Sequence, residues 1–222
     1  MIESITRGEK MKDFPIFTTD FGVASLTLRE IPYRGEAFIL IQDTRQPEEL
    51  LAECVSFCRM CGAEKIYVRG HKITEKYPLH CIVYEMRGIA RVDETKVENL
   101  WPVTEETVMQ WRELMNEKMR PVDNSGTLEK KHEQDILGSG GAYFVHHEGE
   151  LLGAGWLMGN ELLLLCAVKP GAGERVMHTL FSLLPDQEVK LDVVSTNRKA
   201  IRLYEKLGFV RTAEHRRWYR VR

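Results

Sequence analysis

Apolar residues near the C-terminal end of the chain follow first the period of a strand and then the period of a helix. Val189, Leu191 and Val193 alternate with polar residues, which predicts a strand with one buried face. After a polar stretch, apolar side chains recur on one face of a predicted helix. These side chains are Ala200, Ile201, Tyr204 and Leu207. The pattern therefore predicts the order strand, helix, strand.

Both ends of this predicted helix carry residues that suit a helix terminus. Asn197 can accept a hydrogen bond from the first free backbone N–H groups. Gly208 stands where the chain needs a left-handed conformation to leave the helix. We therefore expect the helix to begin just after Asn197 and to end just before Gly208.

The preceding segment predicts a hairpin, an apolar strand and a loop that leads into a helix. Residues 140–157 read as two strands around the turn Glu148-Gly149-Glu150. Residues 161–168 are almost continuously apolar, as expected for a strand that is covered on both faces. The loop 169–175 follows, and an apolar-periodic helix then extends to Leu184.

The glycines of this loop make it a candidate anion site. Gly171 and Gly173 precede a helix N-terminus, where exposed N–H groups and the positive end of the helix dipole favour a diphosphate. The alternative for an isolated Gly-x-Gly pair is a tight strand-to-helix turn that binds nothing.

The residues Asn-x-x-Ala-x-x-Leu-Tyr-Glu-Lys-x-Gly-Phe at positions 197–209 resemble the C-terminal motif of the GNAT N-acetyltransferases. The hairpin 140–157 resembles the one that presents the acceptor site in that family, and the loop 169–175 resembles its acyl-CoA pyrophosphate loop. The loop is shorter than the family pattern, and Val168 stands where Arg or Gln is usual. Lys169 or Arg175 would then supply the missing charge.

This resemblance implies the GNAT acyl-CoA N-acyltransferase fold, an α/β fold with a mixed sheet. It implies that acetyl-CoA, as co-substrate, gives its acetyl group directly to a primary amine in a ternary complex. In that reading Tyr204 protonates the departing thiolate of coenzyme A, while the alternative for Tyr204 is a plain core aromatic. The backbone near residues 166–168 pairs with the pantetheine arm, and a free N–H there holds the oxyanion. The coenzyme-binding residues implied are Cys166, Ala167, Val168, Gly171, Ala172, Gly173, Glu174, Arg175, Asn197, Ala200 and Tyr204.

An alternative function is a catalytically inactive GNAT-like module that binds coenzyme A or a peptide. The short loop favours this alternative, whereas the pair of Asn197 and Tyr204 favours catalysis. The acceptor, a small-molecule or peptide amine, is left open by the sequence, and so is the choice between monomer and homodimer.

The organisation of the chain changes near residue 95, within a polar and charged stretch. We expect residues 96–222 to form the catalytic domain. In it, Thr104 is predicted to cap a helix, and a second helix is predicted at about residues 128–137. The buried stripe of the first helix is predicted to be Val108, Trp111, Met115 and Met119.

Residues 1–95 are expected to form a degenerate GNAT-like domain without a coenzyme of its own, which would make two tandem GNAT-like domains. An unrelated small α+β domain is the alternative. The strands predicted in this half are residues 18–28, 37–42, 65–69 and 79–86.

Three cysteines of this half invite a metal hypothesis. Cys54, Cys58 and Cys61 have a C-x3-C-x2-C spacing that can hold an iron–sulfur cluster. The surrounding sequence, however, predicts one amphipathic helix that starts at Pro47 and ends at Gly62. We therefore expect all three cysteines to form a buried stripe, and we expect no metal.

Histidines and one glutamate are the candidates for a general base. His146 and His147 are neighbours on a predicted strand, so their side chains point to opposite faces and do not share one ion. Either one, or Glu161 at the start of the next strand, is a candidate base. His178 is expected to pack inside its helix.

The composition indicates which classes of partner and which cellular compartment to expect. The chain of 222 residues is 29% charged and 43% hydrophobic, as is usual for a globular protein, and its net charge of −2 gives no footprint for nucleic acid. No apolar run approaches the roughly 18 residues of a membrane span. Residues 1–14 contain no apolar secretion signal, and five cysteines without such a signal indicate reduced thiols, so we expect a cytoplasmic protein.

Overall fold

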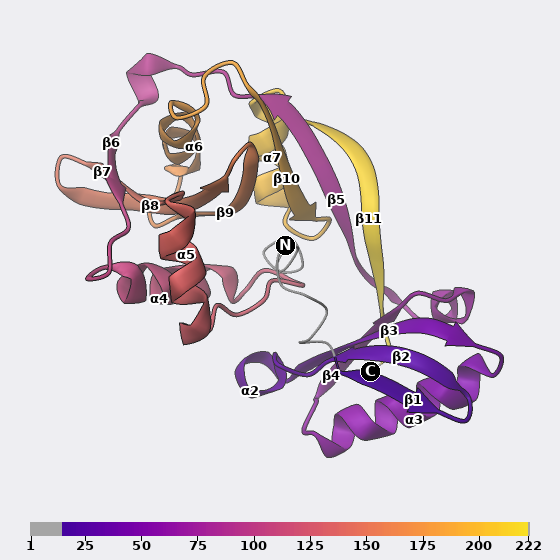
Figure 1. The fold of residues 1–222 in the computed structure, drawn as a ribbon. Coiled ribbons are helices and arrows are strands. Elements are labelled where there is room, and N and C mark those ends of the chain that lie inside the picture. The colour runs from indigo at the N-terminus through magenta and orange to yellow at the C-terminus, as the bar shows by residue number, and fades with distance from the viewer. Residues whose placement is uncertain (1–14, 222) are drawn as a thin grey trace. The chain divides into compact units, whose positions relative to one another are not determined.

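The computed structural model of the chain describes residues 15–221, which form two compact units (Figure 1). The larger unit contains residues 83–214, and the smaller unit contains the described residues up to Ile82 and from His215 onwards. Residues 1–14, where the sequence predicts no secretion signal, lie outside the described residues. The boundaries of these compact units differ from the predicted domain boundary at residue 95. The division into two domains at that residue stays a prediction.

The larger unit is built on a mixed sheet with strand order β11-β5-β10-β9-β8-β7-β6. Strands β9 and β10 pair in parallel, while β5–β10, β8–β9, β7–β8 and β6–β7 are antiparallel. The mixed α/β class is thereby confirmed. The strands are β5 (Leu79–Ile89, in this unit from Val83), β6 (Asn99–Pro102), β7 (Ala142–His147), β8 (Glu150–Met158), β9 (Glu161–Ala167), β10 (Glu188–Val194) and β11 (Val210–Arg220, in this unit to Glu214).

Helices cover both faces of this sheet. Helices α4 (Val108–Met119) and α5 (Glu133–Ser139) pack on one face, and α6 (Gly173–Phe181) and α7 (Arg198–Lys206) pack on the other. Figure 1 shows α6 and α4 on opposite sides of β8 and β9. Short 3₁₀ turns occupy Glu94–Lys96 and Lys130–His132.

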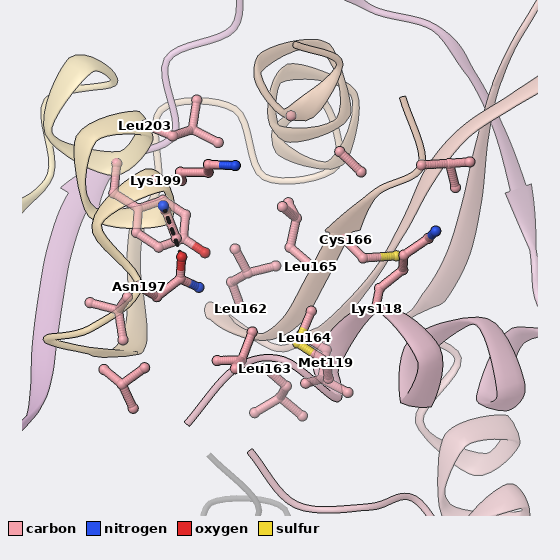
Figure 2. Close-up of a pocket in the computed structure, with 18 of the residues that line it drawn as sticks. Lys118, Met119, Leu162, Leu163, Leu164, Leu165, Cys166, Asn197, Lys199 and Leu203 are labelled. Atoms are coloured by element: carbon pink, nitrogen blue, oxygen red, sulfur yellow. Dashed lines mark hydrogen bonds between the residues drawn. The ribbon is translucent and has the colours of Figure 1, made fainter. Parts of the chain in front are cut away.

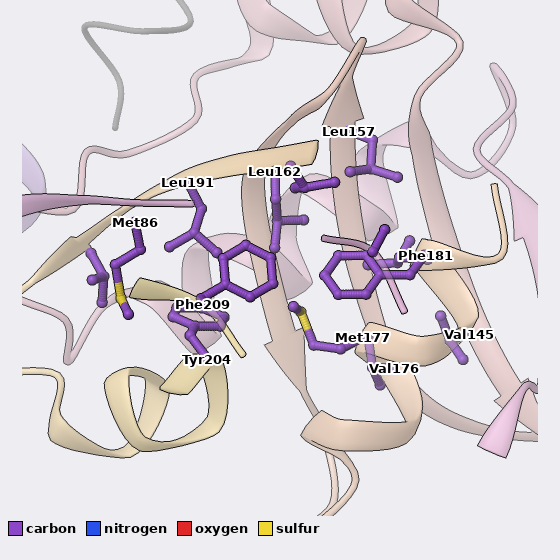
Figure 3. Close-up of a cluster of buried hydrophobic side chains, with 14 of the residues drawn as sticks. Met86, Val145, Leu157, Leu162, Val176, Met177, Phe181, Leu191, Tyr204 and Phe209 are labelled. Atoms are coloured by element: carbon purple, nitrogen blue, oxygen red, sulfur yellow. The ribbon is translucent and has the colours of Figure 1, made fainter. Parts of the chain in front are cut away.

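Two glycines of β8 allow α6 to lie close to the sheet. A Cβ atom added to Gly155 would lie 2.3 Å from Leu180 Cδ1, and one added to Gly153 would lie 2.8 Å from Val176 Cγ2. The resulting core contains Met177 and Phe181 of α6 together with apolar residues of β10 and α7 (Figure 3). Removing these side chains from water is the main driving force for this packing.

The end signals of α7 act as the sequence predicts. The Ala200 N–H donates a hydrogen bond to Asn197 Oδ1 over 3.2 Å, which caps the first turn. Gly208 has φ +85°, and the Phe209 N–H donates to the Tyr204 carbonyl over 2.9 Å as the chain leaves the helix. In the hairpin, Glu148 and Gly149 have φ +50° and +85°, which matches a tight two-residue turn.

Three predicted helix boundaries are wrong. Thr104 does not cap α4, which starts at Val108, because the Thr104 N–H donates to Thr107 Oγ1 in a separate turn. The helix after the glycine loop ends at Phe181 and not at Leu184. The second helix starts at Glu133, after a 3₁₀ turn, and not near residue 128. The predicted apolar stripe of α4 is confirmed for Val108, Trp111 and Met115, which are buried, while Met119 is half-buried.

The smaller unit has strand order β1-β2-β3-β4-β11. The single strand predicted at residues 18–28 is instead a hairpin of β1 and β2, whereas residues 65–69 form β4 as predicted. Strands β3 and β4 are parallel and are joined by α3. The elements are β1 (Ile16–Thr19), β2 (Gly22–Thr27), α2 (Ile31–Arg34), β3 (Glu36–Thr44), α3 (Pro47–Met60), β4 (Lys65–Arg69), a 3₁₀ turn (Lys72–Lys76) and the start of β5.

The cysteine helix is present, but its predicted buried stripe holds only two of the three cysteines. Cys54 and Cys58 are buried, and burial raises the pKa of these thiols to about 11 and about 12. Cys61 lies at the end of α3 and is exposed, so its predicted burial is wrong. Iron–sulfur ligation needs converging thiolates, and residues 15–221 contain no group of His, Cys, Asp or Glu arranged to hold a metal ion.

Within the described part of the chain, no helix is long and apolar enough to cross a membrane.

Candidate functional site

The parallel strands β9 and β10 pair over only two positions and then separate. Their paired residues are Glu161 with Lys190 and Leu162 with Leu191. Beyond this point β9 stays paired with β8 as far as Ala167, while β10 stays paired with β5. The sheet is therefore split between β9 and β10 from Leu163 onwards.

A pocket of about 660 Å³ occupies this split. Figure 2 shows the cap residue Asn197 and, from α7, Lys199 and Leu203 across the pocket from Leu162 and Leu165 of β9, with Lys118 of α4 beside Cys166. The complete lining is Lys118, Met119, Val122, Leu162, Leu163, Leu164, Leu165, Cys166, Ala167, Val168, Lys169, Pro170, Gly171, Gly173, Asp192, Val193, Val194, Asn197, Lys199, Ala200, Leu203 and Tyr204.

The edge of β9 turns backbone groups toward this pocket. The Val168 N–H donates to the Leu152 carbonyl over 2.7 Å, so it is not the free donor expected in the region 166–168. Hydrogen-bonded and non-hydrogen-bonded positions alternate along an antiparallel pair. The N–H groups of Ala167 and Leu165 therefore point away from β8, to the side where β10 has separated.

The glycine loop lies at one end of the pocket and leads directly into α6. Gly171 has φ +84°, a conformation that L side chains rarely adopt, and Gly173 is the first residue of the helix. Ala172 is the N-cap, and its side chain makes no capping hydrogen bond. No side chain of the N-cap therefore occupies the first N–H groups of α6, where the sequence predicts an anion site.

The two cations that were expected to supply charge at the loop already have carboxylate partners. Lys169 forms an ion pair with Glu150, and Arg175 forms one with Glu98, whose side chain is largely buried. Lys169 lines the pocket, but Arg175 does not.

Glu174 is likewise engaged within the protein. Its carboxylate bridges Lys206 of α7 and Lys96, with Lys96 Nζ 2.9 Å from Glu174 Oε1. These hydrogen bonds, first from Lys206 and then from Lys96, lower the pKa of Glu174 to about 2. Of the predicted coenzyme-binding residues, Ala172, Glu174 and Arg175 lie outside the lining, and the other eight lie in it.

Lys199 is a cation of the lining that the sequence reasoning missed. It is exposed at the start of α7, and the described residues give it no ion-pair partner. Its position, two residues after the Asn197 cap, could have identified it from the sequence, because such a residue projects from the same end of the helix. Lys118 is a second missed lysine of the lining, and it pairs with Glu117 over 2.9 Å.

Tyr204 belongs both to the buried core and to the pocket lining. Its side chain is 8% exposed, and its ring centroid lies 6.1 Å from that of Phe209. Burial raises the pKa of the Tyr204 hydroxyl to about 12, so the proton stays on the oxygen at neutral pH. Tyr204 is therefore a protonated phenol among the residues that line the pocket.

The three candidate bases lie outside the pocket lining. His147 Nδ1 lies 2.8 Å from Glu98 Oε2, and the His146 ring lies 5.5 Å from the Trp101 ring. Glu161 forms an ion pair with Lys190 over 2.9 Å. The carboxylate that does line the pocket is Asp192, which the sequence reasoning treated only as a polar position of a strand.

The predicted packing of His178 agrees with its burial in the structure. His178 is buried in α6, where its Nδ1 accepts a hydrogen bond from the Asp93 N–H over 3.2 Å. Cys166 is buried in the lining, and burial raises its thiol pKa to about 11, which opposes a role as a nucleophile.

Comparisons with known proteins agree with this architecture. A family profile described as "Acetyltransferase (GNAT) family" matches residues 97–209. No curated protein matches the chain.

Solved structures share the fold at low sequence identity. A conserved protein of unknown function from Staphylococcus epidermidis is similar with a TM-score of 0.57 and 10% identity, over 99% of this chain and 98% of that one. A GCN5-related N-acetyltransferase from Anabaena variabilis has a TM-score of 0.59 and 10% identity, over 98% of this chain and 64% of that one. One from Kribbella flavida has a TM-score of 0.56 and 14% identity, over 90% and 56% respectively.

Proposed function

The chain belongs to the acetyltransferase (GNAT) family, and we propose that it transfers an acetyl group from acetyl-CoA directly to a primary amine. The observation that carries this proposal is the continuity of one pocket. It joins the start of α6, the separated edge of β9 and Tyr204. A thioester substrate needs all three features, for its diphosphate, its pantetheine arm and its departing sulfur.

The diphosphate is assigned to the turn Gly171–Gly173. Uncapped N–H groups at the start of α6 favour an anion there. Since Lys169 and Arg175 are paired with carboxylates, Lys199 is the lysine best placed to add charge. These N–H groups and Lys199 support diphosphate binding even though the loop is shorter than the family pattern.

The pantetheine arm is assigned to the separated edge of β9. A ligand with amide groups can pair with such an edge as an additional strand does. The N–H groups of Leu165 and Ala167 face this side, and one of them can polarise the thioester carbonyl and stabilise the oxyanion.

The reaction needs no protein nucleophile in this proposal. The amine nitrogen attacks the thioester carbonyl carbon, the carbon–nitrogen bond forms, and the carbon–sulfur bond breaks. Tyr204 gives its proton to the departing thiolate, because a thiol with a reference pKa near 8.5 holds that proton at neutral pH. Tyr204 keeps its proton at neutral pH, as an acid in this role must. Burial raises its pKa to about 12 and so makes it a weaker acid than an ordinary tyrosine.

The smaller unit is proposed to be a degenerate GNAT-like domain without its own coenzyme. Its strands β3 and β4 stay paired along all of β4, from Lys65 to Arg69, so they leave no split like that between β9 and β10. Helix α3 begins at Pro47, which has no N–H, and Glu48 and Glu49 fill its first turn. This helix start therefore disfavours an anion.

The test is to incubate the protein with acetyl-CoA and a panel of small amines and peptides, and to follow the release of free coenzyme A thiol. Binding of coenzyme A is measured in parallel by calorimetry and by the melting temperature, which a ligand of the folded state raises. Amine-dependent thiol release with an acetylated product supports the proposal. Binding without turnover on any amine supports an inactive binding module instead, and no binding at millimolar coenzyme contradicts both.

A further inference from the structure

We propose that Asp192 takes the proton from the acceptor amine before it attacks. This inference rests on the proposed function, and it goes further by assigning the general base. The sequence left His146, His147 and Glu161 as candidates, and all three lie outside the pocket. Asp192 is the carboxylate among the described lining residues.

Asp192 stands where the split in the sheet begins. Leu191 is the last residue of β10 that pairs with β9, and Asp192 is the next residue along β10. The diphosphate turn Gly171–Gly173 lies beyond the other end of the separated β9 edge. From Leu162 to Ala167 this edge spans about 17 Å at the usual rise of a strand. An extended ligand with its diphosphate at the turn and its arm along β9 therefore brings its thioester toward Asp192.

The direction of the side chain follows from the alternation of β10. Val189, Leu191 and Val193 belong to the core that α6 and α7 cover. Successive side chains of a strand point to opposite faces, so Asp192 points to the face away from that core, as Lys190 does. On this face Asp192 pairs in register with Glu85 of β5.

A second cavity, of about 10 Å³, adjoins the pocket at the loop after α4. It shares Val122, Asp192, Val193 and Val194 with the main pocket, and the remaining lining comes from Val83 and the loop 123–125. Asp192 thus lies where the two cavities meet.

The charged groups around Asp192 are consistent with a site for an ammonium group. Glu85 lies opposite on β5, and Asp123 lies in the loop after α4. Lys190 lies on the same face of β10, but its ammonium is held by Glu161 over 2.9 Å. Lys199 and Tyr204 are the titratable groups of the lining that α7 contributes.

The proton balance assigns each group one task. The acceptor arrives as an ammonium ion, since a lysine-like amine has a pKa near 10.4. Asp192 takes one proton from it, directly or through one water, and the neutral nitrogen attacks the carbonyl carbon. As sulfur leaves, Tyr204 gives it a proton, and the second proton lost by nitrogen restores Tyr204. The products are the amide, the coenzyme A thiol and one proton that Asp192 releases to solvent.

The deciding experiment compares Asp192→Asn with Glu161→Gln on the best acceptor of the panel. Both variants change a carboxylate to an amide within the same sheet, but only Asp192 lines the pocket. For Asp192→Asn we expect kcat/KM to fall by about 10²–10⁴-fold, the usual contribution of one acid–base group. The Kd for coenzyme A and the melting temperature should stay close to those of the wild type, and Glu161→Gln should stay within a few-fold of wild-type kcat/KM.

A weakly basic acceptor separates proton removal from positioning. An amine that is already neutral at the assay pH needs no base, so Asp192→Asn should lose far less activity on it. With a basic amine, the variant's kcat/KM should rise about tenfold per pH unit below the acceptor's pKa, because only the neutral amine reacts. Near wild-type activity of Asp192→Asn on the basic amine, or an equal loss on both amines, overturns the assignment. A wild type that acetylates no amine removes the proposed function and this assignment with it.

Discussion

Leu162 of β9 and Leu191 of β10 form the last pair of residues before these two parallel strands separate. Both side chains belong to the buried core beneath α6 and α7. The core thus holds the two strands together at this point, while their continuations remain paired with β8 and β5 on the outer sides. A pocket within the sheet results, lined by one backbone edge and by residues of α7.

Replacing Tyr204 with Phe removes the proton that the proposed mechanism needs and keeps the ring in the core. We expect kcat to fall by about 10²–10⁴-fold with little change in the KM for acetyl-CoA. The melting temperature should fall only slightly, because no cavity is formed. The matched control is Tyr143→Phe, since the Tyr143 hydroxyl bonds to the Gly140 carbonyl outside the pocket. A Tyr204→Phe enzyme with near wild-type kcat would make Tyr204 a core residue only.

The loop turn can be tested with Gly171→Ala. Gly171 has φ +84° and no atom within 4 Å of an added Cβ, so the cost is one of backbone conformation. That cost is about 1–2 kcal/mol of unfolding free energy. We also expect weaker binding of coenzyme A in calorimetry, because relaxing the strain moves the first N–H groups of α6. Gly138→Ala, in α5 and with open space around it, is the control and should leave binding unchanged.

The Glu174 ion pairs should stabilise the protein at neutral pH and lose this effect in acid. The pKa of Glu174 is lowered to about 2 by Lys206 and Lys96, so the carboxylate is harder to protonate in the folded than in the unfolded chain. Its contribution is present above the unfolded pKa of about 4.3 and is lost as pH falls toward about 2.

Melting curves of Glu174→Gln between pH 7 and pH 2 measure this contribution. Since pairs near the surface are worth at most about 1 kcal/mol, the decrease in melting temperature at pH 7 should be small, and it should vanish in strong acid. Glu106→Gln, at an exposed position outside this network, should match the wild type at every pH. A constant difference at all pH values would refute the electrostatic explanation.

Thiol labelling should distinguish Cys61 from the other cysteines of α3. Cys61 is exposed, while Cys54 and Cys58 are buried and have raised pKa values. We expect iodoacetamide to modify Cys61 in the native protein and to spare the other two, as read by mass spectrometry of peptides. Unfolding in denaturant should make all five cysteines reactive. Stoichiometric iron in protein purified without oxygen would contradict the helical arrangement.

Local features were predictable from the sequence, because neighbouring residues determine them. Asn197 and Gly208 mark the ends of α7, and both act through backbone groups within a few residues. The turn at Glu148-Gly149 is of the same kind. The predicted cap at Thr104 is wrong because Thr104 forms a turn with Thr107 instead. Both the cap and the turn are local, so the sequence alone does not show which of the two is more stable.

Features that depend on distant segments were not predictable. The separation of β9 from β10 depends on which strand each one keeps as a partner, and β5 lies about a hundred residues before β10 in the chain. Asp192 acquires its position from that pairing, so its alternating pattern alone identified only a polar strand residue. Similarly, Arg175 looked like a free cation because its partner, Glu98, is distant in sequence.

The separated edge of β9 also has a consequence for the dynamics of the free protein. Amide groups inside a sheet are normally protected from exchange with solvent deuterons, because the next strand holds them. The amides of Leu165 and Ala167 face a pocket instead, so they should exchange as fast as those of an outer strand, although apolar side chains surround them. A bound substrate that pairs with this edge would slow both at once. The amides in this part of the sheet are therefore fully protected from hydrogen exchange only in the complex with substrate.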